Sequence, residues 1–158
     1  MLTILNRQQR LALSIKETRA QLDQLLSLLG YSGWDVGLLF TGNRKIRMLN
    51  RMYRGKDQPT DILSFPFYEV TTPGQVPSPA THDERNLGDI VISAQYVQGY
   101  CQRHQIPVHK HLPLLYTHGL CHLLGYDHET KQQHRQMAQL EQSVLRQFWS
   151  WHKHRKMS

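Results

Sequence analysis

Three histidines and a glycine in one short stretch are the part of this chain best suited to chemistry. His118 and His122 are four positions apart, so on a helix both imidazoles lie on one face, one turn apart. Gly125 follows, and glycine readily takes the left-handed conformation that ends a helix, so the chain can turn back and bring His128 to the same point. Three converging imidazoles predict a metal site of the catalytic type, because a tetrahedral zinc ion held by three side chains keeps its fourth position for water.

A pair of histidines four residues apart is a weak signal by itself. The chain contains ten histidines, and such pairs arise by chance on ordinary helices whose histidines are solvated or part of the core. Gly125 and His128, at the right offsets, favour the metal site over that alternative. Cys121, between the two ligands, is expected to point into the core. The other histidines considered are expected to be solvated: His82, His109, His111, His134, His152 and His154.

The spacing matches that of zinc peptidases with the signature His-Glu-x-x-His-x-x-Gly-x-x-His, except at one position. Those enzymes carry a glutamate that takes the proton from the zinc-bound water, and this chain has Gly119 there. The difference argues against peptide hydrolysis by that mechanism. It leaves other metal-dependent hydrolysis open, because zinc alone can lower the pKa of bound water to about 7.

Length and composition indicate one globular domain of 158 residues, with 39% hydrophobic and 20% charged residues. We expect a metallohydrolase domain over residues 1–150, with a flexible loop at 69–86, and a basic tail over 151–158. No run approaches the roughly 20 apolar residues of a membrane span, and the N-terminus lacks the order of a signal peptide. Two cysteines make no disulfide framework, which favours a cytoplasmic location.

The net charge of +7 is unevenly distributed and predicts a polyanionic partner, although a generally basic soluble surface is the simpler alternative. Residues 43–56 contain six basic residues and no acid: Arg44, Lys45, Arg47, Arg51, Arg54 and Lys56. Residues 146–158 add four more without an acid: Arg146, Lys153, Arg155 and Lys156. The aromatic residues of this C-terminal stretch would suit base stacking, and a frayed terminus is the alternative.

The arginines of the first basic stretch line one face of an expected helix. Arg44, Arg47 and Arg51 are spaced i, i+3 and i+7, and Arg54 continues the row. A row of arginines without acid partners favours phosphate binding, and a solvated helix face is the alternative.

The hydrophobic pattern predicts the elements that position these residues. Strands are expected at 2–5, 35–41, 60–68 and 87–93, and helices at 11–29, from 43, from 93 to about 104, and from 130. The helix bearing His118 starts either near Leu112, with Pro113 in its first turn, or earlier with a kink. We expect an α+β fold with α/β-type layering: a mixed sheet of about four strands packed with about five helices, and the metal site at the end of a buried helix.

Three stretches together resemble the bacterial YbeY endoribonuclease (rRNA maturation factor) family. They are residues 53–67 (YRGKDQPTDILSFPF), 87–93 (LGDIVIS) and 118–128 (HGLCHLLGYDH), which with their order and spacing cover about half the chain. The resemblance implies a zinc-dependent endoribonuclease specific for single strands, acting in 16S ribosomal RNA 3′-end maturation and ribosome quality control. It places one zinc ion on His118, His122 and His128, with Arg54 facing the metal cleft.

The resemblance also suggests a mechanism and a partner. The partner is ribosomal RNA in the small ribosomal subunit, with no membrane involved. The three histidines and Arg54 are the candidate catalytic residues, with Arg54 clamping a phosphate and stabilising developing charge. Asp127 either orients an imidazole or forms the turn before His128. Two alternatives stay open: a non-enzymatic ribosome-assembly factor with a structural zinc, and a zinc peptidase.

Overall fold

The computed structural model describes residues 1–157 and contains one mixed four-stranded sheet. Its strands are β1 (Leu2–Asn6), β2 (Asp35–Thr41), β3 (Ile62–Pro66) and β4 (Asn86–Ser93). The order across the sheet is β1-β2-β4-β3; β1, β2 and β4 are parallel, and β3 runs antiparallel to β4 at the edge. Parallel strands need long crossovers, and the helices between them supply these.

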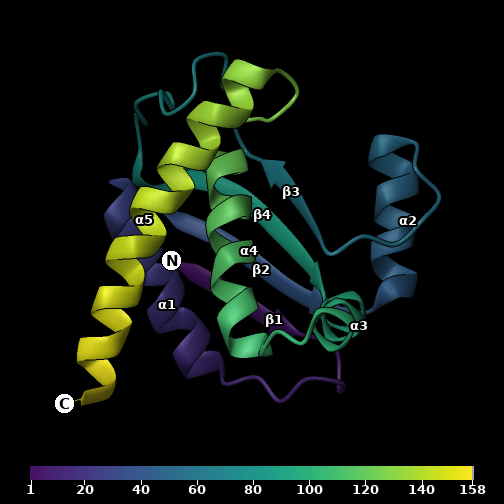
Figure 1. The fold of residues 1–158 in the computed structure, drawn as a ribbon. Coiled ribbons are helices and arrows are strands. Elements are labelled where there is room, and N and C mark those ends of the chain that lie inside the picture. Colours follow the sequence, from purple (N-terminus) through teal and green to yellow (C-terminus); the bar gives the residue numbers. More distant parts are fainter. Residues whose placement is uncertain (158) are drawn as a thin grey trace.

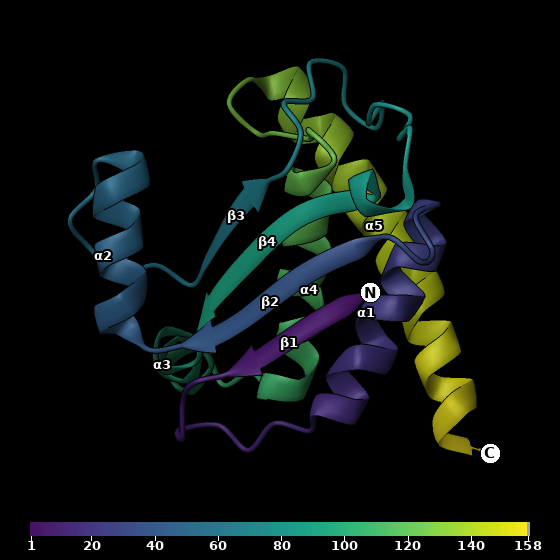
Figure 2. The same cartoon turned by 180° about the vertical axis from the view of Figure 1, so that it is seen from behind.

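The helices are α1 (Ile15–Leu29), α2 (Asn43–Arg54), α3 (Ala94–His104), α4 (Val108–Leu123) and α5 (Lys131–Met157), with a short 3₁₀ turn η1 (His82–Glu84). Helices α1, α4 and α5 cover one face of the sheet (Figure 1). Helix α2 packs on the sheet through a second, smaller hydrophobic cluster, in which its buried Ile46 meets Leu63 of β3 and Val91 of β4. Seen from behind, the other face of the sheet is largely bare of helices (Figure 2). The prediction of an α+β fold with a mixed sheet of about four strands and about five helices is confirmed.

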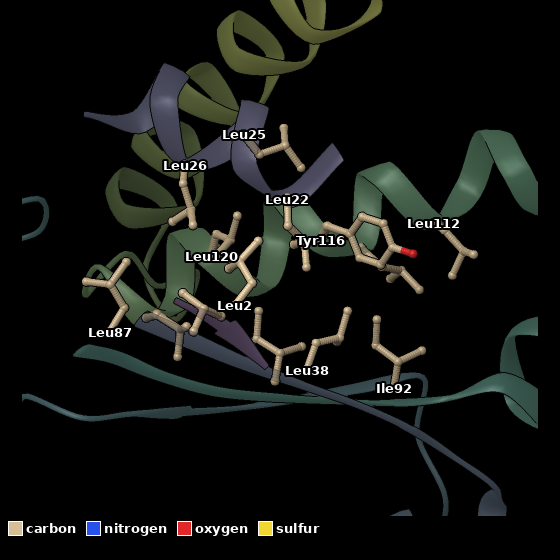
Figure 3. Packing of buried hydrophobic residues seen from close by; sticks show 14 of the residues in the cluster. Leu2, Leu22, Leu25, Leu26, Leu38, Leu87, Ile92, Leu112, Tyr116 and Leu120 are labelled. Carbon is tan, nitrogen blue, oxygen red and sulfur yellow. The ribbon is translucent and has the colours of Figure 1, made fainter. Parts of the chain in front are cut away.

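The core lies between the sheet and α4, so the helix that carries His118 and His122 is firmly buried. Leu22 and Leu26 of α1 and Tyr116 and Leu120 of α4 all have at most 1% of their surface exposed. They pack above strand residues such as Ile92 (Figure 3). Burial of this kind stabilises a fold by roughly 25 cal/mol per Å² of apolar surface. A rigid α4 therefore fixes where its last turn, and the histidines on it, lie.

The structure fixes the starts of two helices that the sequence predicts differently or leaves open. Helix α1 starts at Ile15 rather than residue 11, because the Ser14 side chain accepts a hydrogen bond from the Glu17 amide (3.1 Å) and caps the helix there. Helix α4 has the earlier of its two predicted starts. Its first turn forms where the Pro107 carbonyl accepts hydrogen bonds from the amides of residues 110 and 111, so Pro113 lies inside the helix.

Helix α5 extends well beyond the expected stripe that ends at Phe148, and residues 151–157 form its last turns; Ser158 lies outside the described residues. These turns are not frayed, because they are held to α1. The Arg155 guanidinium donates to the Glu17 carboxylate (3.0 Å) and lies over the Trp151 ring (5.0 Å). Among residues 1–157, no helix is both long and apolar enough to cross a membrane.

Candidate metal centre

Three histidines converge at the end of α4. His118 and His122 lie on one face of the last turns, and the helix ends two residues before Gly125, whose φ of +92° is a conformation that other residues rarely adopt. A side chain at Gly125 would also meet Val70, because its Cβ would lie 2.6 Å from Val70 Cγ1. The turn brings His128 back, so one nitrogen from each ring lies within 4.8 Å of the others.

The outer nitrogens of two rings have partners that fix how the rings point. Nδ1 of His122 lies 2.9 Å from the backbone carbonyl of Tyr126, so this nitrogen carries the proton and donates it. Nδ1 of His118 lies 3.5 Å from Oε2 of Glu141, close enough for the carboxylate to favour a proton on that nitrogen too. In the neutral rings both Nε2 atoms are then left as acceptors.

These two Nε2 atoms face each other at 3.1 Å. Two lone pairs at that distance repel each other unless a positive charge lies between them. Two nitrogens bound tetrahedrally at about 2.0–2.1 Å to one zinc ion lie about 3.3 Å apart, close to the observed separation. The donor set therefore fits a divalent ion of the zinc type. Within residues 1–157 no cysteine, aspartate or glutamate joins the cluster as a fourth ligand.

The surroundings keep the central ring ready for metal. Burial, together with the neighbouring His118 and His128 rings, lowers the pKa of His122 to about 4, so this ring is neutral at pH 7. His128, by contrast, is exposed. One side of the cluster is thus embedded in protein while the other faces solvent, as a catalytic site requires.

Gly119 packs directly against the sheet. An added Cβ would lie 2.9 Å from Ile90 Cδ1 and 3.0 Å from Ile62 Cδ1, closer than real Cβ contacts. The position therefore faces the sheet, and a glutamate there would have to displace the ends of these two isoleucine side chains. This geometry gives a physical reason for the missing general base and counts against the peptidase alternative in its usual form.

The arginine row is only partly available to a ligand. Arg47 makes a two-pronged ion pair with Asp57 (2.9 and 3.2 Å), and Arg51 lies 4.0 Å from the same carboxylate. The expectation of arginines without acid partners was therefore wrong for Arg47 and Arg51. The stretch without acids ends at residue 56, and Asp57, the next residue, folds back onto the helix. Arg44 and Arg54 have no hydrogen-bond or ion-pair partner within residues 1–157. Arg54 is the last residue of α2, whereas the histidines lie at the end of α4 and on the turn after it.

Asp127 takes the turn-forming arrangement. Its carboxylate accepts a hydrogen bond from the His128 amide (2.7 Å), and the structure shows no hydrogen bond from it to an imidazole. It nevertheless lies close enough to favour the protonated form of His122. A role in orienting a ligand therefore stays a prediction.

A protein-family model matches nearly the whole chain. The family model described as "Endoribonuclease YbeY" matches residues 3–149. The chain belongs to the YbeY family. The match includes all three histidines and ends before the last turns of α5.

Individual YbeY proteins are similar along most of their length. A human protein named Endoribonuclease YbeY is 37% identical over 144 residues, covering 91% of this chain and 86% of its own. One from Alkaliphilus metalliredigens, with the same name, is 35% identical over 148 residues, covering 91% and 92%. The solution structure of TM1509 from Thermotoga maritima has the same fold, with a TM-score of 0.63, 22% identity, and coverage of 100% of this chain and 96% of that one.

Glu141 is the residue of this YbeY site that sequence reasoning missed. It lies on the buried face of α5, four residues after the buried Met137 and three residues before the buried Val144. It is also the single acid of a helix with many cations. An acid in an apolar stripe signals a buried partner, but the sequence could not indicate that the partner is His118.

The loop before β4 is tied to the metal turn. The Gly74 amide donates to the Leu124 carbonyl (2.9 Å), and the Tyr31 hydroxyl donates to the Gly74 carbonyl (3.1 Å). Part of the loop expected to be flexible at 69–86 therefore packs beside Gly125 and helps to fix the turn that presents His128.

Proposed function

We propose that this chain is a zinc-dependent, single-strand-specific endoribonuclease that acts in 16S ribosomal RNA 3′-end maturation and ribosome quality control. The partner is ribosomal RNA in the small ribosomal subunit, and the compartment is the cytoplasm, which suits two buried free cysteines. The observation that carries the proposal is the pair of acceptor nitrogens facing each other at 3.1 Å beside His128. Membership of a family whose members are named endoribonucleases supplies the substrate class.

Each residue has a defined part in this proposal. His118, His122 and His128 hold one ion, and Glu141 and the Tyr126 carbonyl keep the first two rings turned toward it. When bound, zinc would supply Lewis acidity toward a water molecule and a phosphate oxygen. Arg54, the last residue of α2, attracts the RNA backbone and balances charge on the phosphate, and Arg44 adds a free cation near the other end of that helix. Arg47 and Arg51 contribute less, because they share Asp57.

The alternative is an assembly factor in which the zinc is structural. Structural zinc sites are closed by four protein ligands. Here three histidines form the cluster, and the outermost is exposed. This open arrangement favours the enzyme.

Metal analysis combined with RNA cleavage tests the proposal. Protein purified without chelators is expected to contain about one zinc per chain, to cleave a single-stranded RNA oligonucleotide but not its duplex, and to lose cleavage with a chelator. His118→Ala should abolish cleavage and keep the circular dichroism of the parent, whereas His109→Ala, an exposed histidine at the other end of α4, should keep both. Unfolding of His118→Ala would indicate a structural zinc, and digestion of casein would indicate a peptidase.

A further inference from the structure

Two hollows meet at the exposed side of the metal cluster and follow α5. One, of about 510 Å³, is lined by His118, His128 and Glu141, and the other, of about 620 Å³, by His128, Lys131 and Arg135. Both are also lined by residues of one face of α5: His134, Ala138 and Gln142. The shared lining makes one continuous groove from the metal ligands to the N-terminal turns of α5, which we call the α5 groove.

The walls of the α5 groove suit a polyanion. Lys131 and Arg135 are exposed, and neither has a hydrogen-bond or ion-pair partner among residues 1–157. The single acid within α5, Glu141, points to His118 instead of outward. Glu129, just before the helix, is the one other acid in the lining. Free cations held on a rigid helix are well placed to neutralise phosphates.

The rest of the lining suits a flexible strand rather than a small anion. Ala138 presents only a methyl group, so the groove stays open where a larger side chain would close it. Gln139 and Gln142 offer amide groups, which can donate to and accept from base edges and ribose hydroxyls. Lys131, Arg135, Ala138 and Gln142 are spaced i, i+4, i+7 and i+11, so they follow one face of the helix.

We infer that the α5 groove is a second RNA-binding track, in which Lys131 and Arg135 bind backbone phosphates of the single strand on the side of the metal centre away from α2. This inference rests on the proposed endoribonuclease function and adds to it the path of the substrate. RNA that spans the site would then be held on both sides of the phosphate next to the histidines: by α2 on one side and by α5 on the other.

The test is a double variant, Lys131→Gln with Arg135→Gln, studied as metal-loaded full-length protein on a single-stranded RNA oligonucleotide. Each phosphate neutralised on a single strand contributes about 0.7 to the slope of log affinity against log salt, which is about fivefold per tenfold change in salt. The KM of the double variant divided by the KM of the parent should therefore be about 25-fold larger at 0.1 M salt than at 1 M salt. The salt slope should fall by about 1.4, and kcat and zinc content should not change.

The matched control is Arg103→Gln with Lys110→Gln. It removes the same charge from exposed positions on α3 and at the start of α4, the end opposite the metal turn. The control should keep the KM and the salt slope of the parent. Equal KM and slope in the two double variants would overturn the α5 track while leaving the proposed function intact. If the parent protein itself fails to cleave RNA, the proposed function fails and the inference fails with it.

Discussion

Oε2 of Glu141 lies 3.5 Å from Nδ1 of His118, which joins α5 to the metal-binding face of α4. Both side chains are partly buried, with 24% and 31% of their surface exposed. The carboxylate keeps the inner nitrogen of the ring free to bind a cation. Helix α5 is therefore part of the candidate metal site as well as a cover for the core.

Glu141→Gln should weaken zinc binding about 10- to 100-fold, which is the usual effect of removing a carboxylate behind a metal-binding histidine. The amide keeps the size of the side chain, so the fold should stay intact. Competition against a chromophoric chelator measures the affinity. Glu129→Gln, a change of an exposed acid that is not bonded to a ring, is the control, and equal affinities for the two variants would contradict the role of Glu141.

Gly119→Glu should destabilise the protein by about 3 kcal/mol or more, because the side chain would be forced against Ile90 and Ile62 and would bury a carboxylate without a partner. It should not create casein-digesting activity, although it restores the peptidase signature. Chemical unfolding and a casein assay measure the two outcomes. Gly99→Glu on α3 is the control, because its added Cβ would meet only the end of the Arg103 side chain.

Arg54→Ala should weaken RNA binding more than Arg47→Ala does. The Arg54 guanidinium has no partner within residues 1–157, whereas the Arg47 guanidinium already donates two hydrogen bonds to the Asp57 carboxylate. At 0.1 M salt the loss of one phosphate contact should be about fivefold. KM values and their salt dependence distinguish the two variants, and a larger loss for Arg47→Ala would show that the Asp57 pair opens when RNA binds.

The contact between α1 and the end of α5 should make stability depend on pH. Burial alone would raise the pKa of Glu17, but the hydrogen bond and charge of Arg155, with the charge of Lys156, lower it below its ordinary 4.5. Because the folded pKa is lower than the unfolded one, the carboxylate stabilises the fold above about pH 4.5, and this stabilisation disappears as the pH falls through the folded pKa.

Glu17→Gln should therefore lower the Tm by about 2–4 °C at pH 7, the size of shift that about 1 kcal/mol produces in a chain of this length. As the pH falls through the lowered pKa of Glu17, the Tm of the variant should approach that of the parent, because the Glu17 carboxyl then becomes neutral. Asp23→Asn, at an exposed position of the same helix, should have little effect over the same pH range. A loss of Tm that stays the same as the parent's Glu17 is protonated would show that packing, not charge, holds the two helices.

The approximate positions of the helices and strands, and the turn after His122, follow from local sequence patterns. The period of apolar residues placed the helices and strands within a few residues, and Gly125 after His122 marked the turn that brings the third histidine back. The helix starts were less well predicted, because they depend on a few local hydrogen bonds at Ser14 and Pro107 that the hydrophobic pattern does not reveal.

By itself the sequence determined the candidate metal-binding trio, the family and the basic character of the chain, because spacing along one helix and its turn fixes which side chains share a face. Only the tertiary structure decided that Glu141 lies beside His118 and that Arg47 pairs with Asp57. It also decided that Gly119 packs directly against β3 and β4. These contacts join residues from different elements, and their geometry depends on how the helices pack on the sheet. No local pattern carries that information.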